Sequence, residues 1–358
     1  MNHHLSSFIN TLPKDSFVVL HGNPEIVRSW DTHFPFRQSS DFLYLTGLSV
    51  PDLILSISWE ETILWRESLT EKDILWGHSK LSDEEIFKIS DIAKIREKKD
   101  FDTYWSSKNE NPSKEAYTNS IHSLRIIKSP DENEKIKKAL AVSKEAFEYV
   151  EQIIKPGMYE YEIEAEFARI FRRYHLTEAY PTIVASGPNA CTLHYTSHNR
   201  KIEEGDLVLI DAGAEYMGYA SDLTRTFFVG EVWERKKEVY DAVLRIKWIA
   251  ENTLKPDISF TEYEIIVRNA MNQELQLLWL IPPNASDEEK NMLSKKYYPH
   301  RTSHFLGLDV HDVGSREAIF VSGMVLTIEP GIYIQEESIG IRIEDDYLIT
   351  NSGCEKLI

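Results

Sequence analysis

The sequence has little cysteine: Cys191 and Cys354 are the only two in 358 residues. Two thiols cannot form the disulfide framework of a small secreted protein, so a reducing compartment is expected. The chain also lacks an apolar run of membrane-spanning length, and its first residues lack the basic and apolar segments of a secretory signal. These absences predict a cytoplasmic protein without disulfides.

Positive charge is also scarce. Forty Lys and Arg residues stand against 58 Asp and Glu residues, which gives a formal net charge of −18. Such a surplus repels phosphate backbones and anionic lipids, so no nucleic-acid partner and no membrane partner are expected. The excess can serve solubility alone, or some of the carboxylates can surround cations.

Several common catalytic signatures are missing. The sequence contains no G-x-S-x-G elbow, no P-loop, no H-E-x-x-H helix and no C-x-x-C pair. None of these motifs therefore identifies the chemistry of the chain.

The length of 358 residues favours two domains. Up to about Ile121, charged helix-like segments alternate with short apolar runs, which is typical of a small α/β unit. The clearest runs are Phe17–Leu20, Leu53–Ile57 and Thr62–Trp65. Ser129-Pro130-Asp131-Glu132 is a capping box that opens an amphipathic stretch through Ile154. We expect a first domain at 1–123 and a second at 124–358.

The second domain contains a faint duplication at an offset of 100 residues. The matching pairs are Glu151/Glu251, Lys155/Lys255, Pro156/Pro256, Glu162/Glu262 and Glu164/Glu264. Chance is the alternative, but a helix, a Lys-Pro turn and a second helix surround both sets, which favours duplication. A duplicated unit would place a site on a pseudo-twofold axis, with ligands from each half.

Two predicted hairpins carry acids at matching positions. In the first, Leu207–Gly213 pairs with a run ending at Val229, and a turn centred between Tyr216 and Met217 would place Asp211 opposite Asp222. In the second hairpin, a turn centred between Glu336 and Glu337 would place Glu329 opposite Glu344. Like charges that face each other in a sheet are destabilising unless something positive lies between them.

Metal ions or arginines could supply that positive charge. Arg225 and Arg342 lie close in sequence to the acids, but two arginines cannot compensate four inward carboxylates. His304 adds a nitrogen ligand, and this donor set suits Mn²⁺, Co²⁺, Fe²⁺ or Zn²⁺. Two ions about 3.5–4 Å apart can activate water for amide hydrolysis, with Glu329 as the preferred proton acceptor.

Three further histidines are candidate site residues. His194 follows a polar turn, while His300 and His311 lie close in sequence to His304. Each of them alone is more often an ordinary surface or hydrogen-bonded histidine.

Taken together, these motifs resemble the pita-bread metallopeptidase family, and within it the branch of aminopeptidase P (Xaa-Pro aminopeptidase) and Xaa-Pro dipeptidase. The segments that carry the resemblance are Asp211–Gly213, Gly218–Phe227, His304–Asp312, Glu329–Tyr333 and Gly340–Asp346, and in the first domain Phe36–Gly47. The last of these is similar to a segment of aminopeptidase P, which favours that activity over the dipeptidase.

The resemblance implies an α/β (α+β) chain with a C-terminal pita-bread catalytic domain of pseudo-twofold symmetry and a smaller N-terminal creatinase-like α/β domain. The implied enzyme cleaves peptides with proline in second position by means of a hydroxide that bridges two divalent ions. Mn²⁺ is expected first, with Co²⁺, Zn²⁺ or Fe²⁺ as alternatives, and the implied assembly is a homodimer or homotetramer. The competing possibilities are an Xaa-Pro dipeptidase and a metal-free relative, either a creatinase-like hydrolase or a peptide-binding pseudoenzyme.

The resemblance also implies a role for each site residue. The implied metal ligands are Asp211, Asp222, His304, Glu329 and Glu344, with Asp222 and Glu344 bridging. The implied substrate contacts are His194, His300, His311, Tyr333 and Arg342, with His300 in the proline pocket. His194, His311, Glu329 and Arg342 would take part in catalysis. Arg301 departs from the family, which often has glycine there, and the loop between Glu329 and Glu344 is short.

Overall fold

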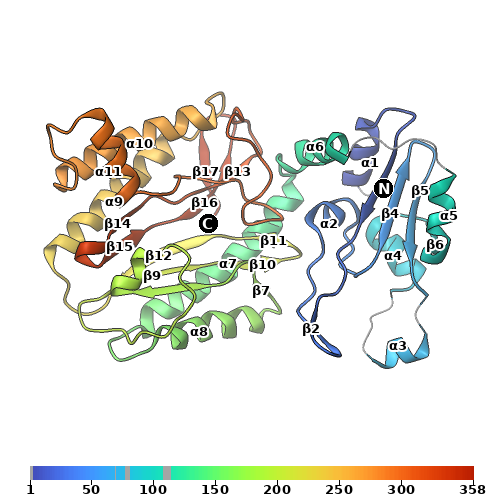
Figure 1. Cartoon of the computed structure of the whole chain (residues 1–358), viewed down its shortest axis with the longest axis horizontal. Helices are drawn as coiled ribbons and strands as arrows, with labels where there is room; N and C mark the ends of the chain where they lie inside the picture. Colours follow the sequence, from blue (N-terminus) through green and yellow to red (C-terminus); the bar gives the residue numbers. More distant parts are fainter. Residues whose placement is uncertain (1–2, 69, 77–80, 108–113) are drawn as a thin grey trace. The chain divides into compact units, whose positions relative to one another are not determined.

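The computed structural model describes residues 3–68, 70–76, 81–107 and 114–358. The chain divides into two compact units, Met1–Arg125 and Ile126–Ile358 (Figure 1). The boundary expected between residues 123 and 124 falls within helix α6 (Lys114–Arg125) of the first unit. Within the described ranges, no helix has both the length and the apolar character needed to cross a bilayer.

The first unit is built on a four-stranded sheet with the strand order β1-β4-β5-β6. The strands are β1 (Phe17–His21), β4 (Ile54–Ser58), β5 (Thr62–Arg66) and β6 (Lys94–Glu97). The first three coincide with the predicted apolar runs, which confirms those runs as strands. Only the β5–β6 pair of this sheet is parallel. The fully buried Trp65 packs against Phe101 on the helical side of the sheet.

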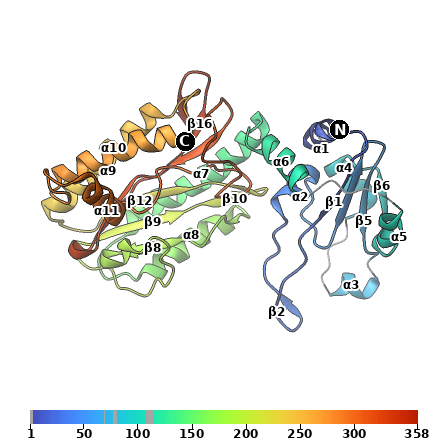
Figure 2. The same ribbon diagram turned by 45° about the horizontal axis from the view of Figure 1, so that its top comes forward.

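Short helices accompany this sheet. They are α1 (His3–Thr11), α2 (Ser40–Thr46), α3 (Glu71–Leu75), α4 (Asp83–Ser90), α5 (Phe101–Ser106) and α6, with a 3-10 turn at Lys98–Asp100. Ser39 caps the start of α2 by accepting from the backbone N–H of Phe42, and Gly47 ends it with a positive φ of 68°. A hairpin formed by β2 (Val27–Ser29) and β3 (Thr32–His33) extends away from the sheet of this unit (Figure 2).

Five helices form the outer layers of the second unit. They are α7 (Pro130–Ile153), α8 (Glu160–Arg173), α9 (Glu234–Thr253), α10 (Phe260–Leu277) and α11 (Asp287–Tyr297). Helix α7 begins at the predicted capping box, in which Ser129 and Glu132 exchange hydrogen bonds between their side chains and backbone N–H groups. The predicted amphipathic helix is therefore confirmed, and it ends one residue earlier than expected.

Small sheets lie between these helices (Figure 1). The sheet of the first half has the order β12-β9-β8, formed by β8 (Ile183–Ser186), β9 (Leu207–Ala212) and β12 (Leu223–Phe228). A separate sheet of the same half has the order β11-β10-β7, formed by β7 (Thr177–Glu178), β10 (Ala214–Tyr216) and β11 (Tyr219–Ala220). The second half has β13 (Val325–Ile328), β16 (Asp345–Ile349) and β17 (Cys354–Lys356) in one sheet and β14 (Gly331–Ile334) with β15 (Ile339–Arg342) in another. Two 3-10 turns, η2 (Gly187–Cys191) and η3 (Gln335–Glu337), connect strands.

The backbone confirms the internal duplication. In the first half, the turn between α7 and α8 pairs with residues 200–202: Gly157 N donates to Ile202 O at 2.8 Å, and Ile202 N donates to Met158 O at 2.8 Å. One hundred residues later, Asp257 N donates to Phe320 O at 3.0 Å, and Phe320 N donates to Ile258 O at 2.9 Å. Both turns make the same pair of backbone bonds, which shows that the two halves repeat one unit.

The predicted register of the first hairpin is wrong by two residues. Asp211 pairs with Thr224, not with Asp222. The tight turn lies at Met217–Gly218, where both φ angles are positive (51° and 84°), as a two-residue hairpin turn requires. Because side chains alternate along a strand with a period of two, a shift of two residues leaves both aspartates on the same face.

The predicted register of the second hairpin is confirmed. Ile328 pairs with Asp345 on one side of the acids, and Gly331 pairs with Arg342 on the other. Glu329 and Glu344 lie between these pairs, where the ladder is interrupted. The backbone of Glu344 also crosses to the first half, because its N–H donates to Thr224 O at 3.0 Å. This bond joins the two acid-bearing hairpins.

Candidate metal centre and active site

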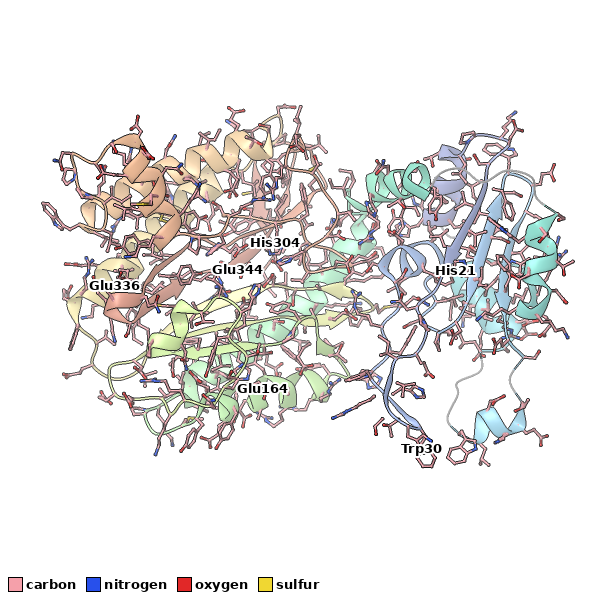
Figure 3. All side chains as sticks on the ribbon, in the orientation of Figure 1. His21, Trp30, Glu164, His304, Glu336 and Glu344 are labelled. Carbon is pink, nitrogen blue, oxygen red and sulfur yellow. The ribbon has the colours of Figure 1, made fainter. Side chains whose placement is uncertain are left out.

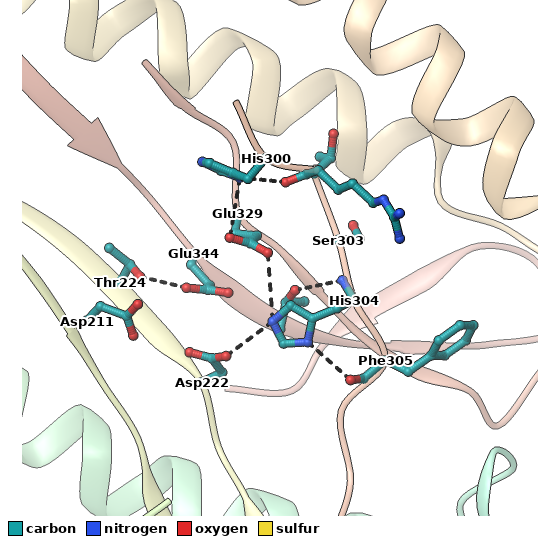
Figure 4. A network of polar contacts seen from close by, with 12 residues as sticks. Asp211, Asp222, Thr224, His300, Ser303, His304, Phe305, Glu329 and Glu344 are labelled. Atoms are coloured by element: carbon teal, nitrogen blue, oxygen red, sulfur yellow. Dashed lines mark hydrogen bonds and ion pairs between the residues drawn. The ribbon is translucent and has the colours of Figure 1, made fainter. Parts of the chain in front are cut away.

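The structure brings all five predicted metal ligands together in the second unit. Two come from the first half, Asp211 in β9 and Asp222 just before β12. Three come from the second half, His304 in an irregular segment and Glu329 and Glu344 at the breaks in the strands. Figure 3 places His304 and Glu344 in the middle of this unit, while Glu336 lies at the distant β14–β15 turn. Figure 4 shows the carboxylates arranged around the imidazole of His304.

One tyrosine hydroxyl links the two aspartates. Tyr180 Oη lies 2.6 Å from Asp211 Oδ1 and 2.6 Å from Asp222 Oδ1. A phenol has one proton to donate, so it cannot fully satisfy two charged oxygens at once. Burial, together with the charges of Asp211 and Asp222, raises the pKa of Tyr180 well above its usual value. The negative charge of the two aspartates is therefore not balanced by Tyr180, and a cation could bind there.

Glu344 has an oxygen without a partner. Its Oε2 accepts from Thr224 Oγ1 at 2.6 Å, whereas its buried Oε1 has no hydrogen-bond donor among the described residues. A buried carboxylate oxygen without a donor is costly unless a cation binds it. Burial and the neighbouring Asp222 raise the pKa of Glu344 to about 8.

His304 presents a lone pair to the acids. Its Nδ1 lies 3.1 Å from the carbonyl oxygen of Phe305, which can only accept, so the proton of the neutral ring is on Nδ1. Nε2 then faces Asp222 Oδ2 at 3.3 Å and Glu329 Oε1 at 3.7 Å (Figure 4). Burial lowers the pKa of His304, which favours the neutral, ligating form.

Arginines neutralise only part of the cluster. Arg342 Nη2 pairs with Asp211 Oδ2 at 2.6 Å, whereas Arg225 pairs with Asp345 at 2.6 Å and reaches none of the four predicted carboxylates. Burial and the charge of Asp211 raise the pKa of Asp222, and burial and the charge of Glu344 raise that of Glu329. The arginine alternative therefore accounts for one acid of the four.

The residues present fit divalent metal ions. Ligand atoms of Asp222, His304 and Glu344 lie within 4.8 Å of one another. The donors are carboxylate oxygens and one imidazole nitrogen, a set that suits Mn²⁺, Fe²⁺, Co²⁺ or Zn²⁺. The unpartnered oxygen of Glu344, the shared proton of Tyr180 and the free lone pair of His304 all indicate a cationic partner.

The acids lie in a cavity of about 480 Å³ that the three other candidate histidines help to line. His194 comes from the segment after η2, His300 from the segment before His304 and His311 from the segment after it. The rings of His304 and His311 lie 4.3 Å apart and nearly perpendicular, and burial, His304 and His194 together lower the pKa of His311. The lining residues are Tyr180, Pro181, Ile183, Leu193, His194, Thr196, Asp211, Asp222, His300, His304, Val310, His311, Glu329, Arg342 and Glu344.

A chain of hydrogen bonds fixes His300 and Tyr333. Arg342 Nη1 donates to Tyr333 Oη at 2.9 Å, and Tyr333 Oη lies 2.8 Å from His300 Nε2. His300 Nδ1 lies 2.7 Å from the carbonyl oxygen of Arg301, so Nδ1 carries the proton and Nε2 accepts from the tyrosine. Burial and Arg342 lower the pKa of His300 to about 3. His300 is therefore neutral throughout the physiological range.

Sequence reasoning missed several residues that hold the site together. Tyr180 precedes Pro181 in a stretch without periodicity, and its contact with both aspartates depends on the fold. The Lys128–Asp312 ion pair, with 2.9 Å between Nζ and Oδ2 and each side chain 1% exposed, joins residues distant in sequence. The charge of Asp312, next to His311, was the only available signal.

Comparisons with known proteins agree with this geometry. Residues 134–351 match the model of metallopeptidase family M24, and residues 2–117 match that of the aminopeptidase P N-terminal domain. The Xaa-Pro aminopeptidase of Escherichia coli K12 is 31% identical, with 98% of this chain and 92% of the relative covered. That of Haemophilus influenzae is 34% identical, with 95% and 89% covered.

A solved structure of E. coli aminopeptidase P with the inhibitor Pro-Leu is also similar to this chain. It has a TM-score of 0.89 at 30% sequence identity, and 99% of this chain and 93% of that chain are covered. The likeness therefore extends over both units of the fold.

Proposed function

The chain belongs to metallopeptidase family M24, and from this premise we propose that it is an Xaa-Pro aminopeptidase. It is a metallo-aminopeptidase that hydrolyses the bond between an N-terminal residue and a following proline. This activity is that of the curated relatives, which match over nearly the full length of the chain.

The observation that carries the proposal is the gathering of four carboxylates around His304 in one cavity. The group contains far more negative charge than Arg342 can balance, and the lone pair of His304 Nε2 points into it. We assign the metal ions to Asp211, Asp222, His304, Glu329 and Glu344. Divalent ions bound there supply Lewis-acid stabilisation of a carbonyl oxygen and lower the pKa of water.

The side chains around the acids provide the remaining chemistry. Glu329 lies in the cavity among the proposed ligands, with its Oε2 3.6 Å from His300 Nδ1, so we assign it the proton from the attacking water. Arg342 orients Asp211 and Tyr333 by direct hydrogen bonds. Proton acceptance and orientation thus come from residues of this chain that touch the ligand cluster.

The histidines suit substrate binding. We propose that His194 and His311 contact the substrate carbonyl, because both line the cavity and the lowered pKa of His311 keeps a neutral ring that donates one hydrogen bond. His300 would line the proline side, and Tyr333, which is not among the lining residues, would act there through its hydrogen bond with His300. Arg301 follows His300 directly, so its side chain is the residue we expect to alter the preference on the proline side.

We further propose Mn²⁺ as the ion in the cell, a cytoplasmic location and a homodimer or homotetramer. The oxygen-rich donor set supports Mn²⁺, and two cysteines without disulfides support a reducing compartment. Exposed apolar side chains on the β2–β3 hairpin, with Trp30 94% exposed, support self-association. Metal analysis of protein purified without added metal, and sedimentation of the same sample, test the ion and the assembly.

Peptide hydrolysis after metal removal tests the activity. We expect EDTA to abolish cleavage of an Xaa-Pro-Yaa tripeptide and Mn²⁺ to restore it, while the matching Xaa-Ala-Yaa peptide stays intact. Cleavage of Xaa-Pro dipeptides alone would identify a dipeptidase. Full activity after exhaustive chelation would contradict the metal centre.

A further inference from the structure

Glu160, the first residue of α8, is a buried acid outside the catalytic cavity. Its exposed fraction is 0%, although a carboxylate is costly to bury. It is not one of the residues that line the cavity, and no metal role is assigned to it. Its burial therefore needs a separate explanation.

The explanation lies in the donors that surround it. Oε1 accepts from Ser186 N at 2.7 Å, from Ser186 Oγ at 2.7 Å and from Asn189 Nδ2 at 3.1 Å. Oε2 accepts from Tyr195 Oη at 2.8 Å and from Arg200 N at 3.0 Å. All of these donors belong to the segment Ser186–Arg200.

This segment carries His194 and has little regular structure of its own. Strand β8 ends at Ser186 and η2 at Cys191, and residues 192–200 form neither helix nor strand. The two ends of the segment, at Ser186 and Arg200, meet at one carboxylate. Tyr195, which the carboxylate also holds, is the immediate neighbour of His194.

The segment also forms one wall of the cavity. Leu193, His194 and Thr196 line it. Leu193 and Tyr195 pack against the apolar cluster that contains Tyr333. This packing supports the middle of the segment. The hydrogen bonds of Glu160 to Tyr195 and to both ends of the segment fix the backbone that carries the exposed side chain of His194.

We propose that Glu160 is a positioning residue that fixes the His194 segment against the active site. This inference rests on the proposed peptidase function, in which His194 contacts the substrate carbonyl. Glu160 acts through Tyr195 and the backbone and does not touch the substrate.

Glu160→Gln tests the proposal, because glutamine keeps the size but turns an N–H₂ group toward half of the donors. We expect kcat/KM to fall roughly 10–100-fold, as when a residue supporting an active-site group is lost, with bound metal unchanged. Glu162→Gln is the matched control: it lies on the exposed side of the same helix, where glutamine is also accepted in the capping box.

A double-mutant cycle separates positioning from general destabilisation. In a His194→Ala background, Glu160→Gln should lower kcat/KM less than about twofold, since its effect passes through His194. Fully additive losses would overturn the proposal. Tyr195→Phe removes a single donor and should give a smaller loss with the same dependence on His194, so it carries the test if Glu160→Gln does not fold.

Hydrogen exchange gives a readout that needs no activity. Backbone amides of Ser186–Arg200 should exchange faster in Glu160→Gln than in wild type or Glu162→Gln, and unchanged exchange would refute the role of Glu160. Faster exchange in a protein that cleaves no Xaa-Pro peptide would instead count against the proposed function alone.

Discussion

The two halves of the second unit repeat the same backbone but hold their active-site segments in different ways. In the first half, Glu160 on α8 gathers neutral donors from the segment that carries His194. In the second half, Glu264 on α10 accepts from Thr302 N at 3.0 Å, and Arg268 donates to His300 O at 3.0 Å. Both helices begin after the duplicated turn, but at the offset of 100 residues Glu160 corresponds to Phe260 and Glu264 to Glu164. The two halves therefore use acids at different helix positions.

The proposed metal ligands differ between the halves as well. The first half supplies two short aspartates linked by Tyr180, and the second supplies two longer glutamates and His304. A centre on the pseudo-twofold axis can take equivalent backbone positions and unequal side chains. The repeated backbone then places the side chains around one centre, and the differences between the side chains give each proposed ligand a distinct role.

The largest expected effect comes from removing one acid from either half. Asp222→Ala and Glu329→Ala should each lose bound metal and lower kcat by at least ~10³-fold, because metal stabilisation of the transition state is worth several kcal/mol. Metal content and peptide turnover, measured together, check this. A loss confined to one of the two variants would break the idea that both halves build one centre.

His311→Ala is the comparison for those variants. It should keep metal content near normal and lower kcat by roughly 10–100-fold, the value of one hydrogen bond to a charged group. Loss of metal in this variant would show that His311 is a ligand and that its assigned role is wrong.

The sequence predicted the parts of the site that local rules control. Strand alternation placed Asp211 and Asp222 on one face even though the register was wrong, because an error of two residues preserves the face. The turn centre was predicted one residue too early because Met217 has a positive φ. A methionine rarely adopts this conformation, so the sequence alone does not predict it.

Contacts between distant segments could not be predicted in the same way. Glu160 meets its donors, Tyr180 meets both aspartates, and Lys128 meets Asp312 only after the chain has folded. Neither periodicity nor spacing in a single sequence encodes such pairs. The duplication was detectable because it repeats residues at a fixed offset, whereas Glu160 and Glu264 stand at different positions of the repeat and leave no such signal.

The next largest effect concerns the segment that carries His311. Its buried Lys128–Asp312 pair lies beside Gly307, where an added Cβ would come within 2.2 Å of Asp312 Oδ2. Lys128→Ala should lower the free energy of unfolding by about 3–5 kcal/mol, since it breaks a buried ion pair. Urea unfolding at fixed metal concentration measures it.

Lys137→Ala is the control for that variant. It breaks a partly exposed pair with Glu134 and should change the free energy of unfolding by less than about 1 kcal/mol. Equal effects of the two substitutions would mean that the Lys128–Asp312 pair does not stabilise the segment that carries His311.

The smallest effect is a pH dependence that comes from Glu264, which accepts from Thr302 N in the second half. Burial raises the pKa of Glu264 to about 7, against partial compensation by Thr302 and Arg268. Between about pH 4.5 and pH 7 the folded protein keeps a proton on Glu264 that the unfolded chain has already lost, so this group makes stability fall as pH rises. The contribution is at most ~1.4 kcal/mol per pH unit.

Glu264→Gln should abolish that contribution, because glutamine does not titrate while its oxygen can still accept from Thr302 N. The measurement is the difference in free energy of unfolding between wild type and variant at several pH values, in which titrations common to both cancel. Glu262→Gln, at an exposed site on the same helix, should leave the wild-type slope intact. A difference that stays constant from pH 4.5 to pH 7 would contradict the raised pKa. A difference that changes with pH would establish that burial favours the protonated form of Glu264 in the folded protein.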